Sequence, residues 1–435
     1  MSDTTKGKWR TCFGVDIFGI DEKIERASEK AAQTCAPVFA RIERMAAKNS
    51  RKVLAAFAEN RVSESHFAPS TGYGYGDRGR DTLDKVFARA LGAEDALVRH
   101  HFVSGTHAIS TALFAVLRPG DVMLSCSGLP YDTLHGVIGL CGSGQGSLKD
   151  YGVQYEQIDL LPAGGLDLDA VAGRLRQSAV KVAYLQRSRG YSLRPSLTIE
   201  AIASFCKTVK HASPDTLVVV DNCYGEFVEE MEPPQVGADL IIGSLIKNPG
   251  GGMADSGGYI AGRHDLVELA GYRLTAPGVG REVGASLGNT RALFKGLFFA
   301  PHVTAQALKT AVFAAALFEQ FGFAATPRWD APRTDIIETI ELGDADALVA
   351  FCQGLQSGSP IDAFVRPEPW DMPGYDSPVI MAAGAFTLGA SIELSADAPL
   401  RPPYAVWMQG GLTFETGMVG VQCAAQALLN GGFLK

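Results

Sequence analysis

The sequence predicts an α/β fold with a large, mostly parallel sheet and a smaller second domain. From about residue 81 to residue 220, short apolar segments alternate with segments whose apolar residues recur at helical spacing. Strands that alternate with helices form βαβ units, which assemble into parallel sheets. The run Leu217-Val218-Val219-Val220 is apolar at every position, which is typical of a central strand covered on both faces. The chain of 435 residues is also too long for one ordinary domain.

The segment before this alternation is expected to be helical and then irregular. Residues 21–60 are rich in Ala, Glu, Lys and Arg with apolar residues at helical spacing, which predicts one or two helices broken near Pro37. The stretch from Ser63 to Arg80 combines Gly, Tyr and Ser without a clean period, so we expect a loop.

Helices and strands are then expected in turn. The expected helices of the large domain cover residues 81–91, 106–117, 133–140, 167–175 and 199–211. The expected strands of that domain cover residues 96–103, 121–126, 154–160, 180–185 and 216–220.

After about residue 310 the pattern changes to one typical of a smaller α+β domain. Its expected helices and strands cover residues 311–321 (helix), 336–342 (strand), 379–394 (strand) and 414–429 (helix). The chain should therefore divide into an N-terminal helical segment (1–62), a large domain (63–310) and a small C-terminal domain (311–435).

Composition argues against several classes of protein. The formal net charge of -8 disfavours nucleic acid and anionic membrane surfaces as partners. No apolar run reaches the roughly 20 residues of a membrane span, and the polar N-terminus shows no signal peptide. The eight cysteines form no C-x-x-C pair, which is typical of a reduced, cytoplasmic protein. No metal is expected, because ligand spacing is missing around His100, His101, His107 and His135.

A small-residue turn opens the expected helix at residue 106. Ser104, Gly105 and Thr106 lie between a strand and a helix, where free backbone N–H groups and the positive end of the helix dipole bind phosphate. The two hydroxyls can add donors. The alternative is a simple helix cap, for which Ser and Thr are preferred in any case.

Two further residues extend this pattern. Asp221 ends a buried strand, where open α/β sheets bind ligands, and a buried carboxylate requires a cation such as a protonated pyridine nitrogen. Lys247 follows the apolar stretch 240–246 and precedes a glycine-rich turn, a setting in which a lysine loses its charge easily and forms a Schiff base. Taken singly, Asp221 could cap the next turn and Lys247 could lie on the surface.

Together these parts match the needs of pyridoxal 5′-phosphate (PLP). The cofactor requires a phosphate clamp, an acid at its ring nitrogen and a lysine Schiff base. The sequence supplies them in the order Ser104–Thr106, Asp221 and Lys247.

The wider set of motifs resembles one family. The chain is similar to the methionine γ-lyase-like, "aluminium-resistance" family of fold-type I PLP enzymes, which is related to the cystathionine γ-synthase and lyase group. The motifs that carry the resemblance are SGTHAI (104–109), PYDT (130–133), QRSRGY (186–191), DN-Y-GEF (221–227), SLIKNPGGG (244–252) and QGGLTFE (409–415). The resemblance implies the fold-type I PLP-dependent transferase fold.

The resemblance also implies roles for single residues. Lys247 would carry the cofactor and Asp221 would pair with its ring nitrogen, while Tyr131 would stack on the ring and act as a second acid or base. The implied phosphate ligands are Ser104, Gly105, Thr106 and Ser244. The sequence departs from the wider group at Ile246, where a hydroxyl residue often precedes the lysine.

Other implied roles concern the substrate and the neighbouring subunit. Tyr73, Tyr75 and Arg78 resemble an arm that reaches the neighbouring subunit's cofactor phosphate, which implies a homodimer or homotetramer with shared active sites. Arg401 resembles the arginine that binds a substrate carboxylate, and Arg189 is the alternative.

The implied activity is elimination of a β or γ substituent, chiefly by cleavage of a carbon–sulfur bond in a small-molecule amino acid. The main alternative is an aminotransferase, which uses the same lysine and acid. A non-catalytic binding protein with this fold would not need both residues. A nicotinamide enzyme would require a strand before the G-x-G-x-x-G match at 74–79, and residues 65–70 do not have the pattern of one.

Overall fold

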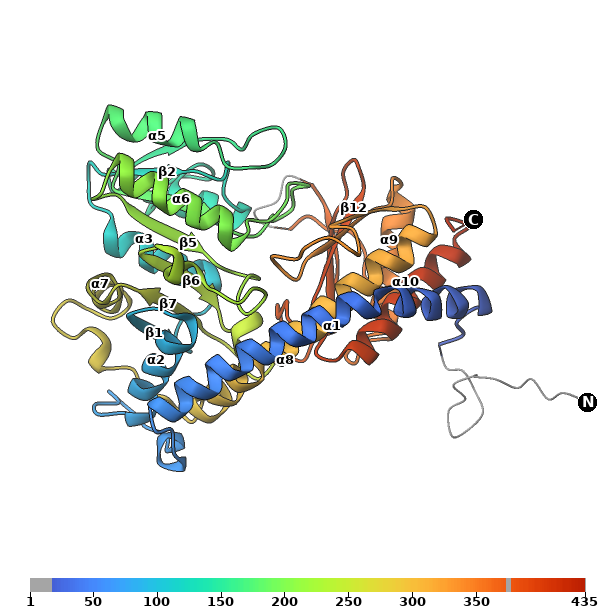
Figure 1. Cartoon of the computed structure of the whole chain (residues 1–435), viewed down its shortest axis with the longest axis horizontal. Coiled ribbons are helices and arrows are strands. Elements are labelled where there is room, and N and C mark those ends of the chain that lie inside the picture. Colours follow the sequence, from blue (N-terminus) through green and yellow to red (C-terminus); the bar gives the residue numbers. More distant parts are fainter. Residues whose placement is uncertain (1–17, 373–376, 435) are drawn as a thin grey trace, which may run out of the picture.

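The computed structural model describes residues 18–372 and 377–434. Two lobes, each built on a sheet, are spanned by the long helices α1 (Glu22–Glu59) and α8 (Thr290–Gln320), which pack side by side (Figure 1). The two sheets lie at opposite ends of this helical pair.

The large sheet has seven strands in the order β1-β7-β6-β5-β4-β2-β3. From β3 to β6 all pairings are parallel, whereas β7 runs antiparallel to both β6 and β1. The expectation of a mostly parallel sheet is confirmed, but β6 and β7 were not among the expected strands, and the helix at residues 264–274 was not expected either. The strands are β1 (Asp95–Arg99), β2 (Val122–Ser125), β3 (Gln154–Gln157), β4 (Val182–Gln186), β5 (Leu217–Asp221), β6 (Leu240–Ser244) and β7 (Gly258–Gly262).

Hydrophobic clusters cover both faces of this sheet. Val218 and Val220 of β5 belong to the cluster that includes α2, α5 and α6, whereas Leu217 and Val219 belong to the cluster that includes α3, α4 and α7. This explains why β5 is apolar at every position before Asp221. The helices are α2 (Arg78–Leu91), α3 (Gly105–Val116), α4 (Asp132–Ile138), α5 (Leu168–Gln177), α6 (Ile199–Ala212) and α7 (His264–Leu274).

The small sheet has five antiparallel strands in the order β10-β11-β12-β9-β8, and helices α9 (Ala345–Ser357) and α10 (Phe414–Asn430) accompany it. The prediction of one strand over 379–394 was wrong, because only its first four residues are extended and two later strands complete the sheet. The strands are β8 (Ala324–Thr326), β9 (Glu338–Glu341), β10 (Val379–Ala382), β11 (Ser395–Pro399) and β12 (Ala405–Gln409).

The predicted break near Pro37 was also wrong. α1 runs through Pro37 without interruption, and its apolar stripe, which includes Cys35, Val38 and Ile42, is buried in one cluster with residues of α8. Tertiary burial along α8 offsets the roughly 3 kcal/mol that a proline costs inside a helix. α8 is likewise far longer than the helix expected over 311–321 and contains Pro301. The domain limits at residues 62 and 310 stay predictions.

The turn after Lys247 packs backbone against backbone on α8. A Cβ atom on Gly296 of α8 would lie 2.3 Å from the carbonyl oxygen of Gly250, and a Cβ on Gly251 would lie 2.3 Å from that of Gly296. Gly251 also has a φ of +52°, which favours glycine. Only glycines therefore allow the approach that holds the Lys247 segment in place.

We expect Gly296→Ala to lower the free energy of unfolding by about 1–3 kcal/mol through overpacking, and to reduce cofactor content by displacing the turn. Chemical denaturation and cofactor absorbance measure both effects. Gly173→Ala in α5 is the matched control, because its added Cβ meets nothing within 4 Å. It should stabilise the helix by about 0.5–1 kcal/mol. Equal stability of the two variants would contradict the steric argument.

Candidate active site

A cavity of about 340 Å³ lies between the large sheet and the small domain. Its wall includes Asp221 at the end of β5, Ser244 at the end of β6, Lys247, and Asp397 on β11 of the small sheet. An adjoining cavity of about 70 Å³ shares Asp221, Lys247 and Asp397. The site thus lies at the carboxyl ends of parallel strands, where open α/β sheets bind ligands.

One end of this cavity has the features of a phosphate site. Ser104 caps α3 and accepts a hydrogen bond from the N–H of His107 (3.1 Å). A Cβ on Gly105 would lie 3.3 Å from the Cβ of Ser244, so a side chain there would narrow the site. The hydroxyls of Thr106 and Thr133 are hydrogen-bonded at 2.8 Å. Backbone N–H groups at a helix start together with several hydroxyls suit a phosphate.

The structure shows which hydroxyl lies near Ile246, the position before the lysine at which the sequence lacks the hydroxyl residue common in the wider group. Ile246 lines the cavity but carries no hydroxyl, whereas Thr133, which sequence reasoning did not select, lines the same end. Its contact with Thr106 offers a replacement donor. Thr133 lies within the quoted PYDT motif, which is the one signal that could have found it.

Asp221 and Lys247 lie on the same cavity. Asp221 is 7 % exposed, and its Oδ1 accepts a hydrogen bond from the N–H of Cys223 (3.1 Å). The Lys247 Nζ lies 3.9 Å from the centre of the Tyr224 ring. Burial lowers the pKa of Lys247, but acidic neighbours that include Asp221 more than offset this and raise it above its ordinary value. Cys223 and Tyr224 have the largest effect among these neighbours, followed by Asp221, which lines the same cavity as Lys247.

Aromatic side chains form another part of the wall. The backbone N–H of Tyr131, at the start of α4, donates to Gln186 Oε1 (2.7 Å). The Tyr131 ring lies 5.9 Å from that of Tyr191, which in turn lies 5.6 Å from Trp407 of β12. Tyr191 and Trp407 were missed as site residues, although Tyr191 is part of the QRSRGY motif.

Three expected site residues do not reach this cavity. Tyr73 and Tyr75 are 75 % and 69 % exposed, Arg78 is exposed at the start of α2, and none of them lines the lysine cavity of its own chain. Arg80 holds their loop, because its Nη1 donates to the carbonyl oxygen of Gly74 (2.9 Å). The loop is thus ordered and presents two aromatic rings outward.

The two candidate carboxylate-binding arginines line a different, neighbouring cavity of about 360 Å³. Tyr131 and Tyr191 separate it from Lys247, since both residues line the cavities on either side. Arg189 is buried, its Nη1 donates to the carbonyl oxygen of Thr326 (2.8 Å), and its buried Nε has no hydrogen-bond partner among the described residues. Arg401 is exposed.

A third arginine, which sequence reasoning missed, also lines the neighbouring cavity. Arg194 donates to the carbonyl oxygens of Pro195 (3.0 Å) and Gln186 (3.0 Å), and burial lowers its pKa to about 10. It supports the loop that carries Arg189. With three arginines against the single acid Asp132, the charged lining of this cavity is net positive and suits an anion.

A buried glutamic acid with a raised pKa lies near the lysine. Glu226 is fully buried, its Oε1 accepts a hydrogen bond from the Tyr259 hydroxyl (2.8 Å), and its buried Oε2 contacts no donor within the described ranges. Burial raises the pKa of Glu226 to about 8. Gly243 makes room for it, because a Cβ there would lie 2.6 Å from Glu226 Oε1. Glu226 belongs to the DN-Y-GEF motif, but the motif alone gives it no role.

Glu226→Gln should remove a pH-dependent loss of stability. Glu226 has a folded-state pKa of about 8 against an ordinary 4.5, so the folded protein retains a proton that the unfolded chain releases. The contribution of this group to the free energy of unfolding is fully present below the unfolded-state pKa. It is lost as the pH rises through the folded-state pKa, and the free energy of unfolding then falls by at most about 1.4 kcal/mol per pH unit.

Denaturant unfolding of both proteins between pH 5 and pH 8.5 measures this slope. The glutamine side chain of the variant still accepts the hydrogen bond from Tyr259 but cannot ionise. As the pH rises, the free energy of unfolding of the variant should therefore increase relative to that of the wild type. The exposed Glu368→Gln is the control for a general charge effect. A difference that stays constant over this range would show that Glu226 is not protonated.

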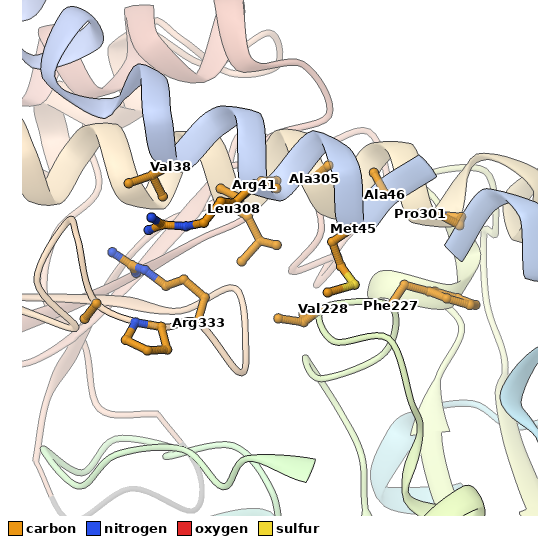
Figure 2. A pocket seen from close by; sticks show the side chains of 13 residues that line it. Val38, Arg41, Met45, Ala46, Phe227, Val228, Pro301, Ala305, Leu308 and Arg333 are labelled. Atoms are coloured by element: carbon orange, nitrogen blue, oxygen red, sulfur yellow. The ribbon is translucent and has the colours of Figure 1, made fainter. Parts of the chain in front are cut away.

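A separate cavity of about 140 Å³ lies between α1, α8 and residues 331–333 (Figure 2). Apolar side chains such as Met45 and Leu308 line most of it, together with Arg41 and Arg333. It shares no residue with the lysine cavity and has no acid or nucleophile in its lining. It therefore lacks the groups for catalysis.

The other classes of site considered from the sequence receive no support. The G-x-G-x-x-G match begins at Gly74 in a loop, and the segment before it is the short turn Glu64–Phe67 rather than a strand. No cluster of three or more metal-type ligands occurs in residues 18–372 and 377–434. Over the same ranges, no helix combines the length and apolar character needed to cross a membrane.

Comparison with known proteins agrees with this geometry. The family model for methionine gamma-lyase matches residues 24–429. The uncharacterised protein YnbB of Bacillus subtilis is 49% identical over 415 residues, which cover 95% of this chain and 98% of the relative. A carbon-sulfur lyase involved in aluminum resistance from Clostridium novyi NT has a TM-score of 0.92 at 48% identity, covering 96% of this chain and 99% of that one. The L-methionine gamma-lyase of Pseudomonas putida is 28% identical over 202 residues, 45% of this chain and 44% of the relative.

Fold and cavity together define a PLP-dependent enzyme of fold type I. The chain belongs to the methionine gamma-lyase family and is a PLP-dependent amino-acid lyase. Its substrate is a small molecule, as the sequence predicted. The comparisons favour lyase chemistry over the alternative of an aminotransferase.

Proposed function

We propose that this lyase cleaves the carbon–sulfur bond at Cβ or Cγ of an amino acid, with Lys247 as the residue that carries PLP. The observation that supports the proposal is the shared cavity of Lys247, Asp221 and the hydroxyl-rich end at Ser104 and Ser244. The similarity to a carbon-sulfur lyase and to a methionine gamma-lyase favours sulfur as the leaving atom.

The residues present fit PLP. The phosphate would take the end of the cavity formed by Ser104, Gly105, Thr106 and Ser244, where a larger residue than glycine would narrow the space. Asp221 would pair with the ring nitrogen, and Tyr131 would lie against the ring. When bound, PLP withdraws electrons from the Cα of an attached amino acid and so acidifies its proton.

The side chains of this protein would then move protons and orient groups. Lys247, once its amine is free and neutral, is the base for the Cα proton, and for a γ substituent it also removes a proton from Cβ. Tyr131 would donate a proton to the departing sulfur. The buried Asp221 keeps a positive charge favourable at the ring nitrogen, because Lys247 is the one cationic residue among the described residues that line its cavity.

For the substrate α-carboxylate, we favour Arg189 over Arg401. Arg189 is buried and its Nε has no hydrogen-bond partner among the described residues, so its guanidinium is costly unless an anion pairs with it. Arg401 is exposed, so water can hydrate its guanidinium when no anion is bound. The carboxylate would lie beyond Tyr131 and Tyr191, in the cavity that all three arginines line.

We further propose a homodimer or homotetramer in which Tyr73, Tyr75 and Arg78 complete the phosphate site of a neighbouring subunit. Their exposure supports this, as does the charge of the lysine cavity, whose only cationic lining residue in the described chain is Lys247. A phosphate dianion is better balanced by an added guanidinium. A cytoplasmic location is consistent with the seven described cysteines, among which the structure contains no disulfide.

Borohydride reduction of the purified protein should attach the cofactor to Lys247, and thioether amino acids should yield a 2-oxo acid, ammonia and a thiol over many turnovers without any added keto acid. Peptide mapping and product assays on β- and γ-thioethers measure this. An adduct on another lysine would refute the role of Lys247. Accumulation of the amine form of the cofactor, reversed only by a keto acid, would instead indicate an aminotransferase.

Arg78→Ala and Lys247→Ala should each lose activity, and a refolded or co-expressed mixture should regain part of it. If the arm crosses between subunits, a mixed pair contains one site with both Lys247 and the partner's Arg78 intact. Activity is measured after mixing, with each variant alone as the control. A mixture as inactive as its components, despite proven subunit exchange, would place Arg78 in its own subunit's site.

A further inference from the structure

The cavity of about 140 Å³ between α1, α8 and residues 331–333 takes no part in the proposed reaction, yet its lining has the character of a binding site. Most of the lining is apolar, and its two charged residues are Arg41 and Arg333. No acid is among the described residues that line it. An apolar wall with a few charged groups of one sign is the usual form of a site for a small organic ion, here an anion.

The two arginines have hydrogen-bonding capacity that the protein leaves unused. The guanidinium of Arg41 on α1 is exposed and forms no ion pair or hydrogen bond with another residue in the described part of the chain. The Arg333 side chain is 5 % exposed, and its Nη1 donates to Glu338 Oε2 (2.5 Å). Its Nε is buried and has no hydrogen-bond partner within the same ranges. An anion in the cavity would lower the cost of this unsatisfied, buried guanidinium.

The charged and apolar parts of the lining are separated. Figure 2 shows the guanidinium groups of Arg41 and Arg333 on the left of the view, whereas Met45 and Phe227 lie to the right of them. A ligand that fits this arrangement has a charged head at one end and an apolar chain at the other. A carboxylate suits the guanidinium side because it can accept two parallel hydrogen bonds from an arginine.

The volume of the cavity limits the length of the chain. An apolar protein cavity of about 150 Å³ holds one benzene molecule, so a cavity of this size accommodates roughly six non-hydrogen atoms. A carboxylate with a short aliphatic chain, such as butanoate, meets this limit. Long-chain fatty acids exceed it.

Both lobes contribute to the cavity. Phe227 and Val228 belong to the large domain and follow Asp221 closely in the sequence, whereas residues 331–333 belong to the small domain. The other lining residues lie on α1 and α8, which span the two lobes. A molecule bound here would contact both lobes and the helices that join them. It would therefore stabilise the arrangement in which the small domain closes the lysine cavity.

We propose that this cavity is a regulatory site for a small aliphatic monocarboxylate. The bound carboxylate favours the closed arrangement of the two lobes and thereby lowers the KM for the amino-acid substrate. The site shares no residue with the arginine-lined cavity beyond Tyr131 or with the lysine cavity. The inference goes beyond the proposed function, because the carboxylate is neither substrate nor cofactor.

The first test is a ligand-observed NMR titration of the holoenzyme with butanoate, with butanamide as the uncharged isostere. Butanoate should bind about tenfold more tightly than butanamide, because only the carboxylate forms charge-assisted hydrogen bonds with a guanidinium. Arg41→Gln should weaken butanoate binding about tenfold for the same reason. Arg44→Gln is the matched control, since Arg44 is exposed on the same helix outside the lining, and it should leave the affinity unchanged.

A second pair of variants tests the apolar side without a change in charge. Ala46→Leu should fill the cavity and abolish butanoate binding, whereas Ala47→Leu, at an exposed position of α1 outside the lining, should have no effect. Leucine is a good helix former, so both variants should retain α1. Absence of binding to the wild type, or equal binding to the wild type, Arg41→Gln and Ala46→Leu proteins, would overturn the inference.

Kinetics test the regulatory effect. Saturating butanoate should lower the KM of the wild type for a thioether substrate about fivefold, a coupling of the usual size between two sites, and should leave the KM of Arg41→Gln unchanged. A wild-type KM that does not fall would overturn the regulatory role, and a KM that rises in both proteins would place butanoate at the substrate's own site. If no thioether is turned over, the proposed function fails, and the titrations of the Arg41 and Ala46 variants still decide whether the carboxylate site exists.

Discussion

The backbone contact between the turn after Lys247 and α8 is the constraint on which the site depends. Lys247 lies three residues after the end of β6 and directly before the three-residue turn Asn248–Gly250, so no regular element of its own holds it. Gly251 and Gly296 allow the turn to lie directly on α8. α8 also packs on α1 and belongs to the hydrophobic cluster of the small domain. One helix therefore sets both the position of the lysine and the width of the cavity that the small domain closes.

Buried charge imposes the second constraint. Asp221 and Asp397 line the same space as Lys247, and Glu226 is buried behind it. A third ionised carboxylate would raise the pKa of Lys247 further and make its neutral form harder to reach. Burial of Glu226 raises its pKa to about 8, which favours its neutral form at neutral pH. The network thus supports Asp221 and Lys247 without adding to the negative charge around them.

Sequence reasoning succeeded where the structure is local and failed where it depends on distant pairing. The βα units and the residues Ser104, Asp221 and Lys247 follow from strand ends and turns that are short in sequence, and the structure brings them to one cavity. Asp397 and Trp407 could not be found in this way, because they meet only through the antiparallel register of β11 and β12. The break expected at Pro37 failed for the same reason, since packing against α8 is invisible to a local pattern.

The charged residues around the site are unevenly distributed, with arginines on one side and carboxylates on the other. Arg189, Arg194 and Arg401 line the cavity on one side of Tyr131 and Tyr191, and Asp397 lies with Lys247 on the other. A guanidinium beside Lys247 would lower the pKa of the lysine, and the arginines line a different cavity, which shares only Tyr131, Gln186, Gly190 and Tyr191 with the small cavity beside Lys247.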